Sequence, residues 1–155
     1  NTRMASDASA QSTGVAEGLL STCMDLARFG LLFEHKGTWQ GKQIVSAEWI
    51  EQATGKPSQK LNSAYGLLWW LNRPGTIRRP LDPGTNRPPV PPKQKQLVPG
   101  APKDMYAAMG FGGQIVLIDP GSKTIVVRMG DPNVGGQLSS YDIPDAARVV
   151  THALK

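Results

Sequence analysis

The stretch from Tyr106 to Gly130 reads YAAMGFGGQIVLIDPGSKTIVVRMG, and it decides the fold. Gln114 to Asp119 and Lys123 to Met129 are two apolar runs rich in β-branched residues, which is typical of strands. Between them, Asp119-Pro120-Gly121-Ser122 predicts a turn, because proline fixes φ at its second position. The stretch therefore predicts an antiparallel hairpin.

This hairpin begins at an unusual run of small residues. Gly110, Gly112 and Gly113 surround one aromatic residue, Phe111, directly before Gln114. Glycine weakens a strand and often marks a place where a ligand or another backbone comes close. A backbone N–H at such a place can donate to a developing oxyanion. A tight packing contact that tolerates no Cβ is the alternative, and from the residues alone both interpretations stay open.

The flanking segments predict helices. Thr22 is suited to cap a helix that ends at Gly37, and Ser46 is suited to cap a shorter helix that Gly55 stops. Residues 143–155 carry proline in the first turn and apolar residues along one side, which predicts a terminal helix.

The remaining segments complete the fold class. Tyr65 to Leu71 is a continuous apolar run, which predicts a strand buried on both faces, and Gln40-Gly41 predicts a turn. Residues 1–14 are small and polar, and we expect them to be irregular. The order of elements predicts an α+β fold with an antiparallel sheet flanked by helices. Because a two-stranded hairpin is marginal alone, we expect the sheet to be incomplete in this chain.

The composition predicts a single region over residues 1–155 with an insertion at 73–103. That insertion holds seven of the basic residues against one acidic residue, and nine of the 13 prolines. We expect an extended, solvated loop there, and the alternative of a nucleic-acid-binding module lacks interleaved aromatic residues. No run of 18 apolar residues predicts a membrane span, and one cysteine excludes an internal disulfide.

Motifs for metal and phosphate binding are absent from the sequence. It has no Cys-x-x-Cys, no His-x-x-x-His and no phosphate-binding glycine loop, so we expect no metal and no cofactor. The two histidines, His35 and His152, fall at predicted helix ends. The segment AQSTG at 10–14 comes nearest to a nucleophile elbow but lacks its first glycine.

Four segments in series nevertheless resemble one family. They are GLLSTCMDLARFG at 18–30, GTWQGKQIVSAEWIEQAT at 37–54, YGLLWW at 65–70, and AMGFGGQIVLIDPGSKTIVVRMG at 108–130. In this order they resemble the C-terminal half of the serine β-lactamase-like hydrolases. That family includes class C β-lactamases, related penicillin-binding proteins, D-aminopeptidases and esterases of the same fold. The resemblance spans Gly18 to Lys155, with the proline-rich segment as an insertion.

The family's first two catalytic motifs do not occur in this chain. No serine is followed by lysine three residues later, and there is no Tyr-x-Asn or Ser-x-Asn. The resemblance therefore implies that an N-terminal portion of the same protein supplies the nucleophile, and that this chain alone is inactive. The start at Asn1 rather than methionine agrees with a fragment or a processed product. Many relatives are exported, but the sequence leaves the compartment open.

The resemblance also implies one wall of a site. Phe111-Gly112-Gly113 takes the place of the family's Lys-Thr-Gly, and the backbone N–H of Gln114 becomes one oxyanion-hole donor. Gly112 and Gly113 would let a small-molecule acyl substrate lie along the strand as an added β-strand. Phe111 stands where relatives place a cation, which favours a neutral ester or amide. A binding or regulatory domain that has lost activity is the alternative.

Overall fold

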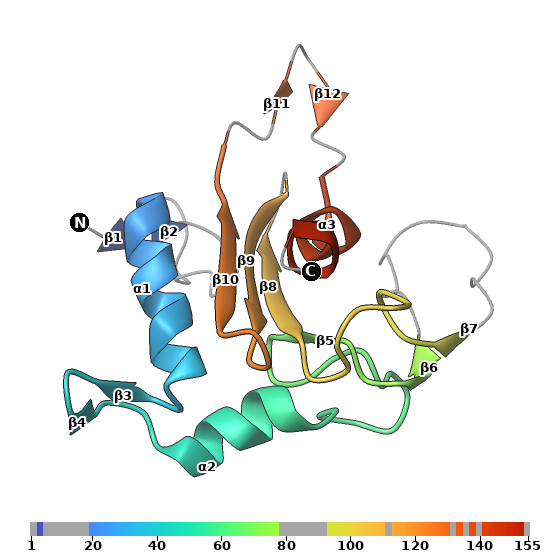
Figure 1. Ribbon diagram of the computed structural model, residues 1–155, viewed down its shortest axis with the longest axis horizontal. Coiled ribbons are helices and arrows are strands. Elements are labelled where there is room, and N and C mark those ends of the chain that lie inside the picture. The colour runs from blue at the N-terminus through green and yellow to red at the C-terminus, as the bar shows by residue number, and fades with distance from the viewer. Residues whose placement is uncertain are drawn as a thin grey trace, which may run out of the picture.

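The computed structural model describes residues 3–4, 19–77, 93–110, 113–130, 133–134, 137–138 and 141–153. Within these residues the main sheet is antiparallel, with strand order β10-β9-β8-β5, and helices cover both of its faces (Figure 1). The strands are β5 (Trp70–Leu71), β8 (Tyr106–Gly110), β9 (Gln114–Asp119) and β10 (Thr124–Arg128). The predicted α+β class, an antiparallel sheet flanked by helices, is confirmed.

The predicted hairpin is the pair β9 and β10, which runs in register from Ile115↔Arg128 to Asp119↔Thr124. Strand β8 was not predicted from the sequence. It pairs with β9 from Tyr106↔Ile118 to Gly110↔Gln114, although its alanines have low strand propensity. Its pairing with β9 overrides that propensity, so the glycine-rich run lies between two strands rather than before the first.

Strand β9 divides the core into two layers, because successive side chains point to opposite faces. Ile115 and Leu117 pack against helix α3 (Ile143–Ala153), whose Ala146, Ala147 and Val150 are buried. Val116 and Ile118 face the other side. There they join a cluster whose further buried members are Phe33, Ile50, Ala53, Trp69, Leu71 and Tyr106. Both faces of the sheet are thus packed.

Helix α1 (Cys23–Glu34) begins as predicted, since the Thr22 hydroxyl accepts a hydrogen bond from the Asp25 N–H at 3.1 Å. It lies close to the sheet at Gly30, where an added Cβ would stand 2.8 Å from the Ile125 side chain. The helix ends at a left-handed turn, where the N–H of Gly37 donates to the carbonyl of Leu32.

The second helix is also capped as predicted. Ser46 accepts from the N–H of Trp49 at 3.2 Å and starts α2 (Ala47–Ile50), which continues into a π-helical turn, η1 (Glu51–Gly55). Before it, β3 (Thr38–Trp39) and β4 (Lys42–Gln43) pair around the predicted turn at Gln40-Gly41, where both residues have positive φ.

The strand predicted from Tyr65 to Leu71 is wrong in its extent. Only Trp70 and Leu71 join the sheet, as β5, and Leu67 and Leu68 are 42% and 71% exposed. The backbone turns back on itself: Gly66 N–H donates to Trp69 O, and Leu71 N–H donates to Ala64 O. A continuous apolar run does not by itself distinguish a strand from a turn that packs part of its side chains.

The base of the 73–103 insertion is ordered by pairing and by one side chain. Strands β6 (Gly75–Ile77) and β7 (Lys93–Lys95) pair with each other. Buried Asn72 donates from Nδ2 to the carbonyls of Val98, Ala101 and Pro102, and its Oδ1 accepts from Val98 N–H at 2.7 Å. Residues 78–92, about half of the predicted loop, lie outside the described residues.

The outer segments form short pairs. Strand β1 (Arg3–Met4), in the segment expected to be irregular, pairs with β2 (Leu19–Leu20), and β11 (Asn133–Val134) pairs with β12 (Gln137–Leu138). The predicted terminal helix corresponds to α3. No helix in the described ranges has the length and apolar character needed to cross a membrane.

Candidate functional site

The candidate site lies where β8 turns into β9, and we call residues 110–114 the glycine turn. Gly110 and Gln114 face each other in the register of the two strands. Gly113 is buried and has φ +76°, which is a left-handed conformation that L side chains rarely adopt. A left-handed glycine directly before a strand is typical of a glycine bulge, where the ladder of backbone hydrogen bonds is interrupted. Phe111 and Gly112 lie outside the described residues.

Side-chain hydrogen bonds connect this turn to the end of β10 and to Gly130. The amide of Gln114 donates to the carbonyl of Gly130 at 2.6 Å and accepts from the N–H of Gly130 at 3.0 Å. Arg128 donates from Nη1 to the carbonyl of Gly113 at 2.7 Å. Three hydrogen bonds therefore connect Gly113 and Gln114 to Arg128 and Gly130.

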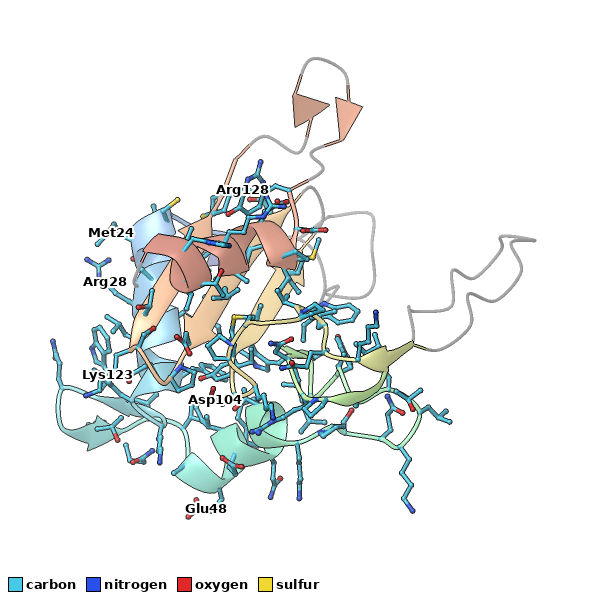
Figure 2. The ribbon with its side chains drawn as sticks, turned by 45° about the vertical axis from the view of Figure 1, so that its right-hand side comes forward. Met24, Arg28, Glu48, Asp104, Lys123 and Arg128 are labelled. Atoms are coloured by element: carbon cyan, nitrogen blue, oxygen red, sulfur yellow. The ribbon has the colours of Figure 1, made fainter. Side chains whose placement is uncertain are left out.

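Arg128 is a site residue that the sequence reasoning missed. Its guanidinium carbon lies 5.0 Å from the centre of the Tyr141 ring, in cation–π contact, while it also bonds to the glycine turn. Figure 2 shows it at one end of the sheet, with Lys123 at the opposite end. The signal available in the sequence was a cation closing an otherwise uncharged strand, TIVVR.

The expectation that an acyl group lies along the strand at Gly112 and Gly113 stays a prediction, because Gly112 lies outside the described residues. Strand β9 is paired with β8 on one side and, from Ile115 onward, with β10 on the other. Beside the glycine turn, β8 pairs with β5 only through Tyr106 and Ala107. Within the described residues, the backbone edge near the turn that lacks a strand partner is that of β8 at residues 108–110.

Tyr106, at the start of β8, does not have the properties of a general base. It is 6% exposed and packs edge-on against Trp69. Burial, followed by the negative charges of Glu34 and Glu51, raises the pKa of its hydroxyl, so the neutral form dominates at neutral pH.

The part of the chain that the structure describes contains no preformed set of metal-binding side chains. No group of three or more His, Cys, Asp or Glu side chains gathers there. The single cysteine, Cys23, is exposed and has no disulfide partner.

Comparison with known proteins supports the fold. No protein-family model and no curated protein matches the sequence. Among solved structures, the chain is similar to a protein from Bacillus anthracis classified as a 6-aminohexanoate-dimer hydrolase, with a TM-score of 0.50 and 22% identity. The match covers 79% of this chain, and the chain spans about a quarter (26%) of the length of that protein. That neighbour has a β-lactamase-like fold, so the likeness is consistent with a part of this fold.

Proposed function

We propose that this chain is the C-terminal portion of a β-lactamase-related serine hydrolase that acts on an ester or amide through an acyl-enzyme. An N-terminal portion of the same protein would supply the serine nucleophile and its activating lysine, and this chain alone would be inactive. It would contribute one wall of the acyl site and one oxyanion-hole donor, and it would need no cofactor.

The observation that carries this proposal is the likeness in fold to a hydrolase over most of this chain. The neighbour's name describes a hydrolase, and the likeness extends across 79% of the present chain but only 26% of the neighbour. That asymmetry supports a chain that represents one portion of a larger enzyme. The four sequence segments that resemble the family also occur in this chain in the family's order.

The glycine turn is the part of the site that this chain would supply. By the family resemblance, the acyl group would lie along the strand at Gly112 and Gly113, which follow directly on β8. Gln114 lies just before the β9–β10 register, which begins at Ile115, and its backbone N–H would donate to the carbonyl oxygen of the substrate. Gly113 would admit the acyl group, because no Cβ stands in its way and its left-handed backbone suits only glycine.

Phe111 and Arg128 together favour a neutral acyl group. By the family resemblance, Phe111 replaces the cation that relatives use to hold a substrate carboxylate. Arg128 brings a cation to the same turn, but one of its nitrogens is engaged with the Gly113 carbonyl and the guanidinium lies over Tyr141. A substrate without a carboxylate at that place fits this arrangement best.

A serine-directed fluorophosphonate probe on the full-length protein tests the proposal. We expect one serine in a Ser-x-x-Lys motif, upstream of residue 1 of this chain, to become labelled, as peptide mass spectrometry would show. Phe111→Lys should lower turnover of neutral p-nitrophenyl esters without abolishing the labelling. Absence of labelling of such a serine would contradict the proposal.

The second candidate is a non-catalytic binding or regulatory domain derived from the same fold. Phe111 in the place of the family's cation favours this second candidate, because loss of that cation is expected in a pocket that has lost its catalytic activity. The upstream coding sequence separates the two candidates: intact Ser-x-x-Lys and Tyr-x-Asn motifs support the enzyme, and decay of both supports the binding domain.

A further inference from the structure

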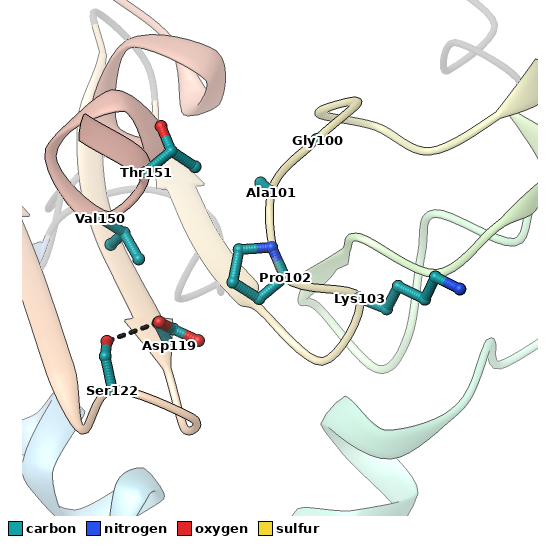
Figure 3. A pocket seen from close by; sticks show the side chains of 8 residues that line it. All are labelled: Gly100, Ala101, Pro102, Lys103, Asp119, Ser122, Val150 and Thr151. Carbon is teal, nitrogen blue, oxygen red and sulfur yellow. Dashed lines mark hydrogen bonds between the residues drawn. The ribbon is translucent and has the colours of Figure 1, made fainter. Parts of the chain in front are cut away.

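An open cavity lies at the opposite end of β9 from the glycine turn. It has a volume of about 390 Å³ and is lined by the end of the β9–β10 hairpin, the segment 100–103 and the C-terminal half of α3 (Figure 3). This volume falls in the range of small-molecule sites, roughly 300–1,000 Å³. We propose that this cavity binds a small primary ammonium ligand through Asp119. This inference does not rest on the proposed hydrolase activity.

Asp119 is the feature of the cavity that calls for a ligand. It is 2% exposed, and its Oδ2 accepts a hydrogen bond from the Ser122 hydroxyl at 2.5 Å. Its Oδ1 is buried and has no hydrogen-bond partner within the described residues. A buried carboxylate oxygen without a partner is costly, so a donor that reaches Oδ1 gains more than it would at the surface.

Ser122 is the polar group that meets Asp119 in this cavity. Its hydroxyl already donates its hydrogen to Asp119, and its oxygen keeps lone pairs that can accept from a ligand. Thr151 also lines the cavity but lies apart from Asp119 on α3, where its hydroxyl donates to the carbonyl of Ala147 at 3.0 Å (Figure 3). An ammonium group, which carries donors and no acceptor, matches Asp119 Oδ1 and the Ser122 oxygen.

The acidic side chain and the apolar walls of the cavity determine which hydrogen-bond donors fit. Asp119 is the acidic residue of the lining, and Figure 3 shows the Lys103 side chain extending away from it. The walls also include Ala101, Pro102 and Val150, which suit a short alkyl chain. A divalent metal ion is not favoured, because the described residues gather no group of three metal-ligating side chains. The ligand class is therefore a small alkylammonium ion.

Saturation-transfer NMR on the full-length protein, titrated with n-butylammonium chloride, tests this inference. We expect saturable binding to the native protein that Asp119→Asn weakens at least about tenfold, because the charge-assisted hydrogen bond is lost. Asp104→Asn removes an exposed carboxylate nearby and is the matched control, with unchanged binding expected. Tetramethylammonium, which has the charge but no N–H donor, and n-butanol, which has the alkyl chain but no charge, should not compete.

The other outcomes overturn the inference. Absence of saturable binding, or equal binding in Asp119→Asn, would show that the ammonium group does not meet this carboxylate. Effective competition by n-butanol would show that the site binds the alkyl chain alone. Competition by tetramethylammonium would show that the site recognises the positive charge without an N–H donor. If Asp119→Asn does not fold, Ser122→Ala decides: a change in affinity supports the site, and unchanged binding contradicts it.

Discussion

The polar groups at the two ends of β9 differ in how completely they are hydrogen-bonded. At the glycine turn, Arg128 donates to the Gly113 carbonyl, and the Gln114 amide is bonded to both backbone groups of Gly130. At the other end, one side chain, Ser122, meets one oxygen of Asp119 and leaves the second oxygen buried without a partner among the described residues.

This difference shows how one strand can present two kinds of surface. Where neighbouring side chains satisfy the backbone, the turn is held in place and can position a backbone donor. Where one oxygen of a buried carboxyl group lacks a hydrogen-bond partner, a ligand that donates to that oxygen can supply the missing bond. The predictions below perturb each end in turn.

The largest expected effect is at the glycine turn. We predict that Gly113→Val in the full-length protein lowers kcat/KM for a neutral ester at least about 100-fold. A β-branched residue is strained at φ +76°, and its Cβ would stand where the acyl group enters. Steady-state ester hydrolysis measures this effect.

Gly121→Ala is the matched control, because this glycine lies exposed in the other hairpin turn and an added Cβ meets only Asp119 at 3.6 Å. It should leave ester hydrolysis within about twofold of the native value, since it touches no part of the proposed acyl site. Equal losses in the two variants would mean that the glycine turn has no special part in the reaction.

At the opposite end, Ser122→Ala should destabilise the protein by about 2 kcal/mol, because it removes the hydrogen bond to Oδ2 of a buried carboxylate whose Oδ1 already lacks a partner among the described residues. Urea unfolding measures the change. Thr124→Ala, which removes a weaker and exposed hydrogen bond at 3.4 Å, is the control and should cost less. A Ser122→Ala variant as stable as the native protein would refute the idea of a deficit at Asp119.

Removing the cation from the glycine turn is expected to act on kcat. Arg128→Met keeps most of the side-chain length but loses the hydrogen bond to Gly113, so we expect kcat for ester hydrolysis to fall about tenfold with KM little changed. Arg128→Lys should recover part of the loss. A change confined to KM would instead indicate that Arg128 binds substrate directly.

The smallest effect is expected for Gln114→Ala. The backbone N–H is kept, so turnover per folded molecule should change little, whereas the loss of both bonds to Gly130 should cost about 1 kcal/mol of stability. Chemical unfolding and active-site titration separate the two quantities. A large loss of turnover with unchanged stability would place the Gln114 side chain, not its backbone, in the reaction.

Much of the fold could be predicted because its signals are local. The caps of α1 and α2, the turn at Gln40-Gly41 and the β9–β10 hairpin all depend on residues within a few positions of one another. Strand β8 could not be predicted in this way, because its sequence of small residues becomes a strand through pairing with β9. The continuous strand at 65–71 failed for a related reason: the hydrogen bond from Leu67 N–H to Ala53 O, which helps to make the turn, joins distant residues.

The site was predictable only in part. The run of glycines marked the turn, and Gly113 with positive φ agrees with a need for glycine there. The contribution of Arg128 depends on a register that brings the last residue of β10 beside the first residues of β9. Asp119 was assigned only to a turn, since its burial depends on α3 and the segment 100–103, which lie far from it in the sequence.

The hydrogen bonds of Asn72 to the segment 98–102 bear on how the chain tolerates insertions and deletions. Because Asn72 and the pairing of β6 with β7 close the base of the proline-rich segment, the sheet is connected to that base rather than to the residues beyond it. Doubling the length of a closed loop costs only about 0.6 kcal/mol in closure entropy. We therefore expect that residues added between β6 and β7 leave this closed base, and the strand register on which both ends of β9 depend, unchanged.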